Sequence, residues 1–217
     1  MGHAQLTISS KTYSAWSLRG WLMCKLAGLE VQELPAPRDA SNRAELLLLS
    51  PSVLVPRLTH EGASVWDTLA IAEYLNELYP AAGMLPADSI ARAHCRSISG
   101  EIHSGFTNLR SALPMNLKVK HASFPVFSGA KPDIERIEAI WDECLTRYGG
   151  PFLFGAAPTI ADAMYAPVTR RFIGYAVAVS PQSAAYCATI DGWAPMQEWL
   201  AAALAEPEEM EELEVEF

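Results

Sequence analysis

The sequence has no closely spaced pair of cysteines, and so it lacks the usual signature of a zinc site or a redox-active disulfide. Its four cysteines lie far apart along 217 residues, and none has a histidine at the spacing of metal ligands. We expect no disulfide framework and no bound metal, and a reducing cytoplasm suits such a chain. Half of the residues are hydrophobic, which is enough to build a core without covalent cross-links.

Long apolar runs are also missing. No stretch of about 18 apolar residues occurs, which is the length that a membrane-spanning helix needs. The first residues do not show the charged region and apolar region of a secretory signal peptide. We therefore expect neither export nor a membrane segment.

Basic residues are too few to form an extended positive surface. The formal net charge is −9, with 16 Lys and Arg against 25 Asp and Glu, and seven of the acids lie within residues 206–217. Without these seven acids, the rest of the chain has a formal net charge of only −2. Without a basic stripe to bind phosphate backbones, nucleic acid is not an expected partner. We interpret residues 206–217 as a solvated, frayed acidic tail.

The first part of the chain alternates between strand and helix patterns. A strand is expected near residues 6–9, a helix over 17–28 ending at Gly28, and a second strand over 30–34. A short helix over 41–49, a hairpin over 50–66 and a helix over 68–78 follow. The expected order is βαβαββα, an α/β arrangement.

Strand patterns disappear beyond about residue 80, and the second part is expected to be all-helical. The expected helices cover residues 86–120, a segment ending near Tyr148, 159–176, 181–188 and 193–204. This change in composition predicts one domain over residues 1–80 and a second over 87–217, which includes the acidic tail.

Hydroxyl groups crowd the expected turn between the first strand and the first helix. Thr12, Tyr13, Ser14 and Ser17 all lie there. The start of a helix has unpaired N–H groups and a partial positive charge, so this turn could hold an anion or lower the pKa of a thiol. From this stretch alone, the better interpretation is that Ser14 or Ser17 caps the helix.

Two further positions have the chemistry of a peptide-binding site. Val55-Pro56 begins an expected strand, and an extended ligand could pair with the backbone of Val55, although residue statistics alone favour a trans bond. Asp67-Thr68 begins a helix, where a hydroxyl and free N–H groups would hold a carboxylate and Asp67 would pair with an ammonium group. A third helix start, Thr159 to Asp162, reads as a structural capping box.

Four stretches together resemble the cytosolic glutathione S-transferase superfamily. They are Tyr13-Ser14-Ala15-Trp16-Ser17-Leu18-Arg19, Val55-Pro56-Arg57-Leu58, Val65 to Leu75, and Thr159-Ile160-Ala161-Asp162. The first of them looks most like an uncharacterised bacterial group of that superfamily. The resemblance spans both halves of the chain in order. It implies a thioredoxin-like N-terminal domain, an all-α C-terminal domain, a homodimer, and glutathione as co-substrate with no metal.

The resemblance also implies roles for particular residues. Val55, before a cis Pro56, would pair with the cysteinyl backbone of glutathione, while Asp67 and Thr68 would hold its γ-glutamyl group. Leu54 stands where the family commonly has Lys, so one cationic contact to glutathione is missing. Trp16 is expected to form a wall of the glutathione site.

Three residues compete for the role of the thiol-activating hydroxyl. An alignment with the serine-type classes puts Thr12 at their catalytic Ser, whereas the local motif favours Ser14, and Tyr13 is also within reach. We rank Ser14 first, Thr12 second and Tyr13 third. A single hydroxyl is sufficient, because a charge-assisted hydrogen bond contributes about 1.5 to 3 kcal/mol and one pKa unit corresponds to about 1.4 kcal/mol.

The electrophile is expected to lie against the first long helix of the second half, beside His103, Phe106, Arg110 and Met115. Ordinary structural roles compete for these residues: Arg110 as a solvated charge and His103 as a hydrogen-bonded helix residue. Packing is the expected role of Trp21, and Cys24 reads as a small buried hydrophobe.

The leading functional prediction is a glutathione transferase that joins the glutathione thiolate to small hydrophobic electrophiles. The Ser-rich turn with its Trp also prompts an alternative, a glutathione-dependent isomerase of the maleylacetoacetate type, although the Ser-Ser-Cys signature is absent. The third possibility is a glutathione-fold binding protein without catalysis.

Overall fold

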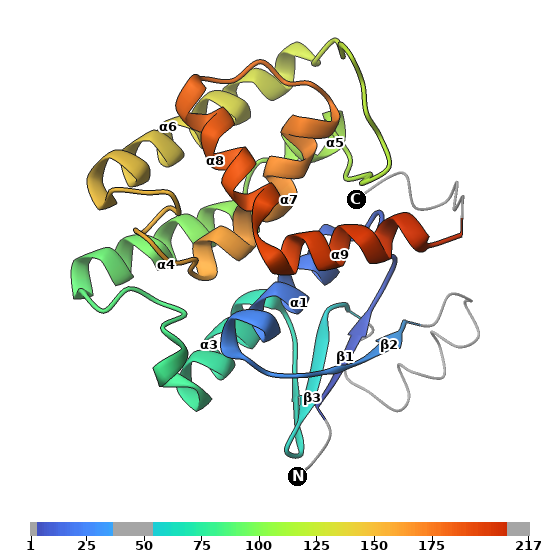
Figure 1. Cartoon of the computed structure of the whole chain (residues 1–217), viewed down its shortest axis with the longest axis vertical. Coiled ribbons are helices and arrows are strands. Elements are labelled where there is room, and N and C mark those ends of the chain that lie inside the picture. Colours follow the sequence, from blue (N-terminus) through green and yellow to red (C-terminus); the bar gives the residue numbers. More distant parts are fainter. Residues whose placement is uncertain (1–3, 37–53, 208–217) are drawn as a thin grey trace.

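A four-stranded mixed sheet forms the centre of the N-terminal part. The computed structural model describes residues 4–36 and 54–207 (Figure 1). Strand order is β2-β1-β3-β4, with β1 (Gln5–Ile8) parallel to β2 (Gln32–Pro35) and antiparallel to β3 (Arg57–His60). The fourth strand, β4 (Ala63–Val65), completes the expected hairpin with β3.

Two helices accompany this sheet. Helix α1 (Ala15–Ala27) ends at Gly28, which has a φ of 71°, and α3 (Thr68–Leu78) begins after Asp67. Leu6, Ile8 and Leu58 on the strands are buried together with most of α1. The two helices also contact each other. The start of α1 is thereby fixed against the sheet.

A glycine allows α1 to approach the segment before β3. A Cβ atom added at Gly20 would lie 2.5 Å from Cγ of Pro56, closer than any side chain permits. Pro56 is buried at this contact. Helix α1 and the Val55-Pro56 peptide are consequently held side by side.

The remaining part of the chain is helical, as expected. Its elements are α4 (Ser89–Ser104), α5 (Thr107–Ala112), α6 (Lys131–Tyr148), α7 (Ile160–Gly174), α8 (Pro181–Gly192) and α9 (Ala194–Ala205), with 3-10 turns at Pro80–Ala82 and Ser128–Ala130. Helix α7 is central: it contacts α1, α4 and α8, and nearly all its residues are buried. Helix α9 lies across the boundary between the helices and the sheet (Figure 1).

The capping box expected at the start of α7 is confirmed. The Asp162 carboxylate accepts hydrogen bonds from the Leu153 N–H (3.0 Å), the Thr159 N–H (2.8 Å) and the Thr159 hydroxyl (3.0 Å) through its two oxygens. The Tyr186 hydroxyl of α8 donates a fourth, at 3.1 Å. Burial raises the pKa of Asp162, and these hydrogen bonds oppose that rise. The carboxylate joins the start of α7 to α8.

The prediction of a single helix over residues 86–120 was wrong. Helix α4 ends at Ser104, and α5 forms a separate short helix. Gly105 is extended, and a Cβ atom there would lie 2.8 Å from the Glu101 carbonyl oxygen. Phe106 follows with a φ of 62°, and its side chain is buried. The chain therefore turns at Gly105-Phe106 so that the Phe106 side chain can enter the core.

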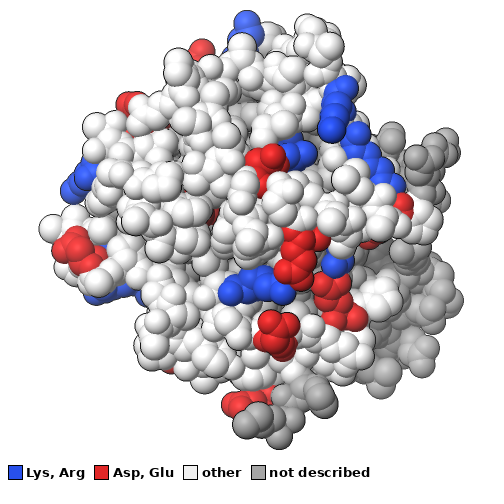
Figure 2. All heavy atoms as spheres, in the orientation of Figure 1, with Lys and Arg blue, Asp and Glu red and all other residues white. Residues whose placement is uncertain are grey.

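Several expectations fall outside the described residues: the helix over 41–49, the start of the hairpin over 50–53, and the acidic tail beyond residue 207. Over residues 4–36 and 54–207, no helix is long and apolar enough to cross a membrane, and no cluster of His, Cys, Asp and Glu is arranged to hold a metal. On the face shown in Figure 2, blue and red side chains are interspersed and no continuous basic stripe appears.

Candidate active site

Ser14 lies at the start of α1 as its N-cap. Its hydroxyl oxygen accepts a hydrogen bond from the Ser17 N–H at 3.2 Å and lies 2.9 Å from the Ser17 oxygen. Ser17 is fully buried, and its oxygen also accepts the Ser9 N–H at 2.9 Å. The expected capping is therefore confirmed for Ser14, while Ser17 joins the helix to the end of the first strand.

Thr12 has a different environment from Ser14. It is 1% exposed, and its hydroxyl lies 2.9 Å from Oε2 of Glu206 and 3.1 Å from the Ala203 carbonyl oxygen. This hydroxyl thus faces the end of α9. Tyr13 is half-buried beside it. The Thr12 hydroxyl is engaged with α9, and the ranking of the three hydroxyls stays a prediction.

The sequence did not indicate that Glu206 belongs to this turn. Its Oε1 accepts the Lys11 N–H (2.7 Å), and its Oε2 accepts the Ser10 hydroxyl (2.8 Å) and the Thr12 N–H (3.0 Å). Describing residues 206–217 as a solvated tail was therefore wrong for Glu206. No local pattern could reveal this contact, because nearly the whole chain separates the two sides.

These hydrogen bonds make the stability of the protein depend on the charge of Glu206. Burial raises the pKa of this carboxyl, but the bonds from Lys11, Ser10 and Thr12 outweigh it, and the pKa is lowered below its ordinary value of 4.5. A lowered pKa stabilises the folded state above the unfolded pKa, and this contribution disappears as the pH falls through the folded pKa.

Glu206→Gln should consequently be less stable than the wild type at neutral pH, and the difference should shrink as the pH falls below about 4.5. Urea unfolding of both proteins from pH 7 to pH 3 measures this. A difference that stays constant over the whole range would show that the Glu206 charge does not matter.

The Val55-Pro56 bond is cis, as the resemblance implied and residue statistics did not. Val55 is half-buried and Leu54 is 61% exposed immediately before it. Because Pro56 packs on Gly20 of α1, the backbone of Val55 is held on the same side of the molecule as α1.

Asp67, Thr68 and His103 meet at the start of α3. Asp67 is the N-cap, and its Oδ1 accepts the N–H groups of Leu69 (2.9 Å) and Ala70 (3.4 Å). Its Oδ2 lies 3.3 Å from Nε2 of His103. Thr68 is fully buried, and its hydroxyl lies 3.5 Å from Nδ1 of His103. The imidazole of α4 therefore covers Thr68 from outside, which the sequence did not indicate.

Trp16 is surrounded by cationic side chains. The Arg19 guanidinium lies 4.5 Å from the Trp16 ring centre and the Arg110 guanidinium 4.9 Å, both within the range of cation–π attraction. His103 meets the ring edge-on at 5.1 Å. Arg110 also donates hydrogen bonds to the carbonyl oxygens of Ile102 and His103, so it is not a freely solvated charge.

The other residues expected beside the electrophile are more enclosed. Phe106 is 8% exposed and Met115 is 2% exposed. The structure thus brings His103 and Arg110 to Trp16, whereas Phe106 and Met115 lie in the core. Trp21 is buried against Trp199, with ring centres 5.3 Å apart, as the packing interpretation expected. Burial raises the pKa of Cys24 to about 12, in agreement with its expected role as a small hydrophobe.

Comparison with known proteins agrees with this architecture. Residues 13–78 match the family model for the glutathione S-transferase N-terminal domain, and residues 120–202 match that for the C-terminal domain. A probable maleylacetoacetate isomerase of Caenorhabditis elegans is 28% identical over 168 residues, or 77% of this chain and 78% of that protein. Glutathione S-transferase 1 of Dianthus caryophyllus is 28% identical over 164 residues, or 75% and 74%.

Solved structures give the same result. A glutathione transferase homologue from Burkholderia, crystallised with bound glutathione, superposes with a TM-score of 0.70 and 26% identity over 94% of this chain and all of that one. A maleylacetoacetate isomerase from Anaeromyxobacter dehalogenans shares the fold, with a TM-score of 0.64, 20% identity and coverage of 91% and 94%. The two family models, matched in order on a thioredoxin-like part and a helical part, show that the chain belongs to the glutathione S-transferase superfamily.

Proposed function

We propose that this protein binds glutathione along its thioredoxin-like part and activates the glutathione thiol for attack on an electrophile. The observation that carries the proposal is the contact between Pro56 and Gly20, which holds the Val55 backbone beside the helix that Ser14 caps. A peptide paired with Val55 can then direct its cysteine towards the start of α1. The glutathione bound to the Burkholderia homologue supports the same ligand.

The chemistry assigned to Ser14 is stabilisation of a thiolate. A cysteine thiol has a pKa of about 8.5, and the thiolate is the form that attacks electrophiles. The Ser14 hydroxyl would donate its hydrogen to the sulfur and no longer to the Ser17 hydroxyl oxygen, while its oxygen keeps the Ser17 N–H. Such a bond contributes about 1.5 to 3 kcal/mol, and the start of α1 adds about 0.3 to 1 kcal/mol. The thiol proton is released to water, and the thiolate forms a bond to the electrophilic carbon, which either expels a leaving group such as halide into water or breaks the π bond of an activated double bond that then takes up a proton.

The γ-glutamyl group of glutathione is assigned to the start of α3. Its ammonium would pair with Asp67, and its carboxylate would approach Thr68 and His103. Because Thr68 is fully buried beneath the imidazole, we assign the outer contact with the carboxylate to His103.

Leu54 supplies no cation, which predicts weak affinity for glutathione. We also infer a homodimer, which the resemblance to the superfamily implies, and a cytoplasmic location; light scattering tests the dimer by a mass twice that of the chain.

Titration calorimetry with glutathione tests the proposal directly. We expect binding with a dissociation constant below the millimolar range. The matched ligand is cysteinylglycine, which lacks the γ-glutamyl group and should bind more weakly. No heat of binding at millimolar glutathione would contradict the proposed function, whether as a transferase or as an isomerase.

A second candidate function is glutathione-dependent isomerisation of an acidic substrate of the maleylacetoacetate type. The observation that favours it is the Arg110 guanidinium beside Trp16, because a guanidinium suits a substrate carboxylate better than an apolar group. In this reaction the thiolate would add to a carbon–carbon double bond and leave again after rotation, so glutathione is not consumed. The names of several relatives support this candidate.

Arg110→Ala separates the two candidates. If Arg110 binds the carboxylate of the substrate, this variant should lower kcat/KM for maleylacetone about tenfold more than kcat/KM for a neutral aryl halide. The lost charge-assisted contact is worth about 1.4 kcal/mol, which corresponds to a factor of ten in rate. The control is Arg136→Ala, since Arg136 forms an exposed pair with Glu101. Equal losses for both substrates would contradict an acidic electrophile and favour conjugation.

A further inference from the structure

We propose that Glu206, at the end of α9, is a positioning residue for the thiol-activating turn. Its carboxylate accepts hydrogen bonds from two backbone N–H groups, of Lys11 and Thr12, and from the hydroxyl of Ser10. The Thr12 hydroxyl adds a contact at 2.9 Å. One side chain from the helical part of the chain thereby fixes three consecutive residues of the turn that leads to Ser14.

A continuous set of hydrogen bonds connects Glu206 with Ser14. The Ser10 hydroxyl donates to Glu206, and its oxygen accepts the N–H groups of Thr12 (3.1 Å) and Tyr13 (3.3 Å). The Ser14 N–H in turn donates to the Ser10 carbonyl oxygen at 3.0 Å. Ser10 is therefore the link, and its orientation depends on the carboxylate of Glu206.

Further hydrogen bonds hold this turn and the backbone of Glu206 in place. The Trp199 indole N–H of α9 donates to the Lys11 carbonyl oxygen (2.9 Å), and the Leu117 N–H donates to that of Thr12 (3.2 Å). The Lys118 ammonium donates to the Glu206 carbonyl oxygen at 2.8 Å. Lys11, the other nearby cation, pairs with Glu33 and lies 4.9 Å from the Trp199 ring centre. The carbonyl oxygens of Lys11 and Thr12 are thus engaged with the helical part, two to three residues before Ser14.

Two other roles for Glu206 predict different results. If the carboxylate acted through its charge, removing it would lower the pKa of the bound thiol, because a nearby negative charge disfavours a thiolate. If it only stabilised the fold, the pKa of the bound thiol would not change. A positioning role predicts that the pKa of the thiol rises when Glu206 is replaced, the opposite of what a charge effect predicts. The reason is that a loosened turn weakens the hydrogen bond from Ser14 to the sulfur.

The inference rests on the proposed function, and Glu206→Gln tests it. The amide keeps the size of the side chain but cannot accept every hydrogen bond that the carboxylate accepts. We expect the pKa of bound glutathione to rise by about half a unit to one unit and kcat to fall about three- to tenfold. KM for glutathione should change less than about twofold, because Val55 and Asp67 are untouched. Glu206→Asp, which keeps the charge on a shorter side chain, should give the same sign and covers a failure of Glu206→Gln to fold.

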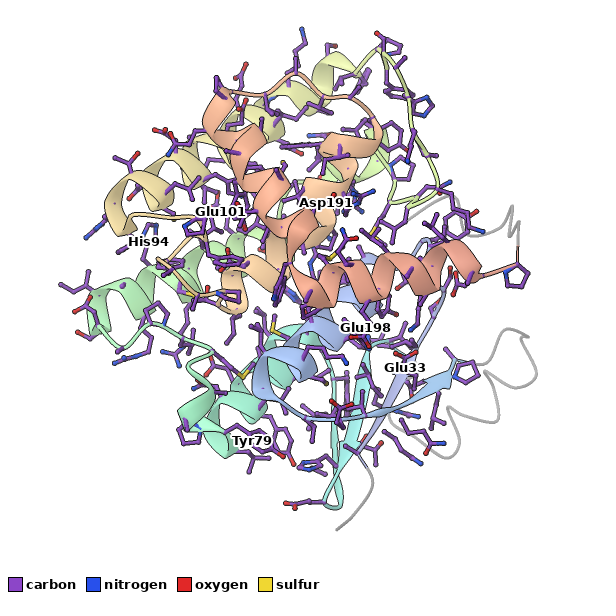
Figure 3. The ribbon with its side chains drawn as sticks, in the orientation of Figure 1. Glu33, Tyr79, His94, Glu101, Asp191 and Glu198 are labelled. Carbon is purple, nitrogen blue, oxygen red and sulfur yellow. The ribbon has the colours of Figure 1, made fainter. Side chains whose placement is uncertain are left out.

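The control variant is Glu198→Gln on the same helix. Glu198 is 59% exposed and pairs with Lys25 of α1, where α9 faces the sheet-containing part (Figure 3). The Glu198→Gln variant should leave the pKa of the bound thiol unchanged. Amide hydrogen exchange without glutathione provides a second readout: exchange at residues 10–13 should become faster in Glu206→Gln and not in Glu198→Gln.

An unchanged or lowered pKa of the bound thiol in folded Glu206→Gln, or unchanged exchange at residues 10–13, would overturn the positioning role. Failure of the wild type to bind glutathione is a separate result. It would overturn the proposed function, and this inference with it, before any variant is compared.

Discussion

Replacing Ser14 with alanine is expected to raise the pKa of the bound glutathione thiol by about one to two units and to lower kcat/KM at neutral pH by about 10- to 100-fold. The hydroxyl caps α1 and is the one we assign to sulfur. Alanine removes its hydrogen bond to the thiolate, so the thiol remains protonated. The ultraviolet absorbance of the thiolate, followed against pH with bound glutathione, measures the shift.

Companion variants separate catalysis from capping. Loss of an N-cap costs about 1 kcal/mol of stability, so Ser14→Ala should also unfold at a lower temperature. Ser14→Asn keeps a side-chain cap without a hydroxyl, whereas Ser14→Thr keeps both. We expect the pKa of the thiol to rise in the first and to stay near the wild-type value in the second. An unchanged titration in Ser14→Ala, with a shifted one in Thr12→Ala or Tyr13→Phe, would reverse the ranking of the three hydroxyls.

Replacing Asp162 with alanine is expected to reduce the free energy of unfolding by about 3 to 5 kcal/mol, the largest effect on stability. The carboxylate is fully buried and accepts hydrogen bonds from Leu153, Thr159 and Tyr186. Alanine would leave these donors buried without an acceptor, at a cost of about 1 to 3 kcal/mol for each unsatisfied group before relaxation.

Thermal unfolding followed by circular dichroism measures the effect of Asp162→Ala. A protein of this size loses about 2 to 4 °C of Tm per kcal/mol, so we expect a decrease of about 10 °C. Asp142→Ala is the control, because Asp142 is exposed on α6. If both variants unfolded within about 2 °C of the wild type, the Asp162 hydrogen bonds would not be important for stability.

Local sequence signals predicted most of the described fold. Helix caps act within a few residues, so Ser14, Asp67 and the Thr159 to Asp162 box could be recognised without knowledge of the tertiary structure. The turn at Gly62 likewise joins β3 and β4 as the hairpin pattern predicted. The same holds for the C-terminal end of α1, where Gly28 adopts a positive φ.

Contacts between distant segments could not be predicted in this way. Glu206 reaches the first turn across nearly the whole chain, and a run of glutamates in the sequence indicates only a polar tail. His103 covers Thr68 because α4 packs beside α3, which no periodicity specifies. The break at Gly105-Phe106 follows from burial of the phenyl ring, whereas the local pattern favours a continuous helix. Packing determined each of these features, and each lies at or near the candidate site.

The proposed function requires that the start of α1 lower the pKa of the bound glutathione thiol. A pH titration of the thiolate absorbance of glutathione bound to the wild-type protein tests it most directly. We expect the bound thiol to titrate at least one unit below the reference of about 8.5 for a free cysteine thiol. Bound glutathione that titrates at the value of the free thiol would contradict it.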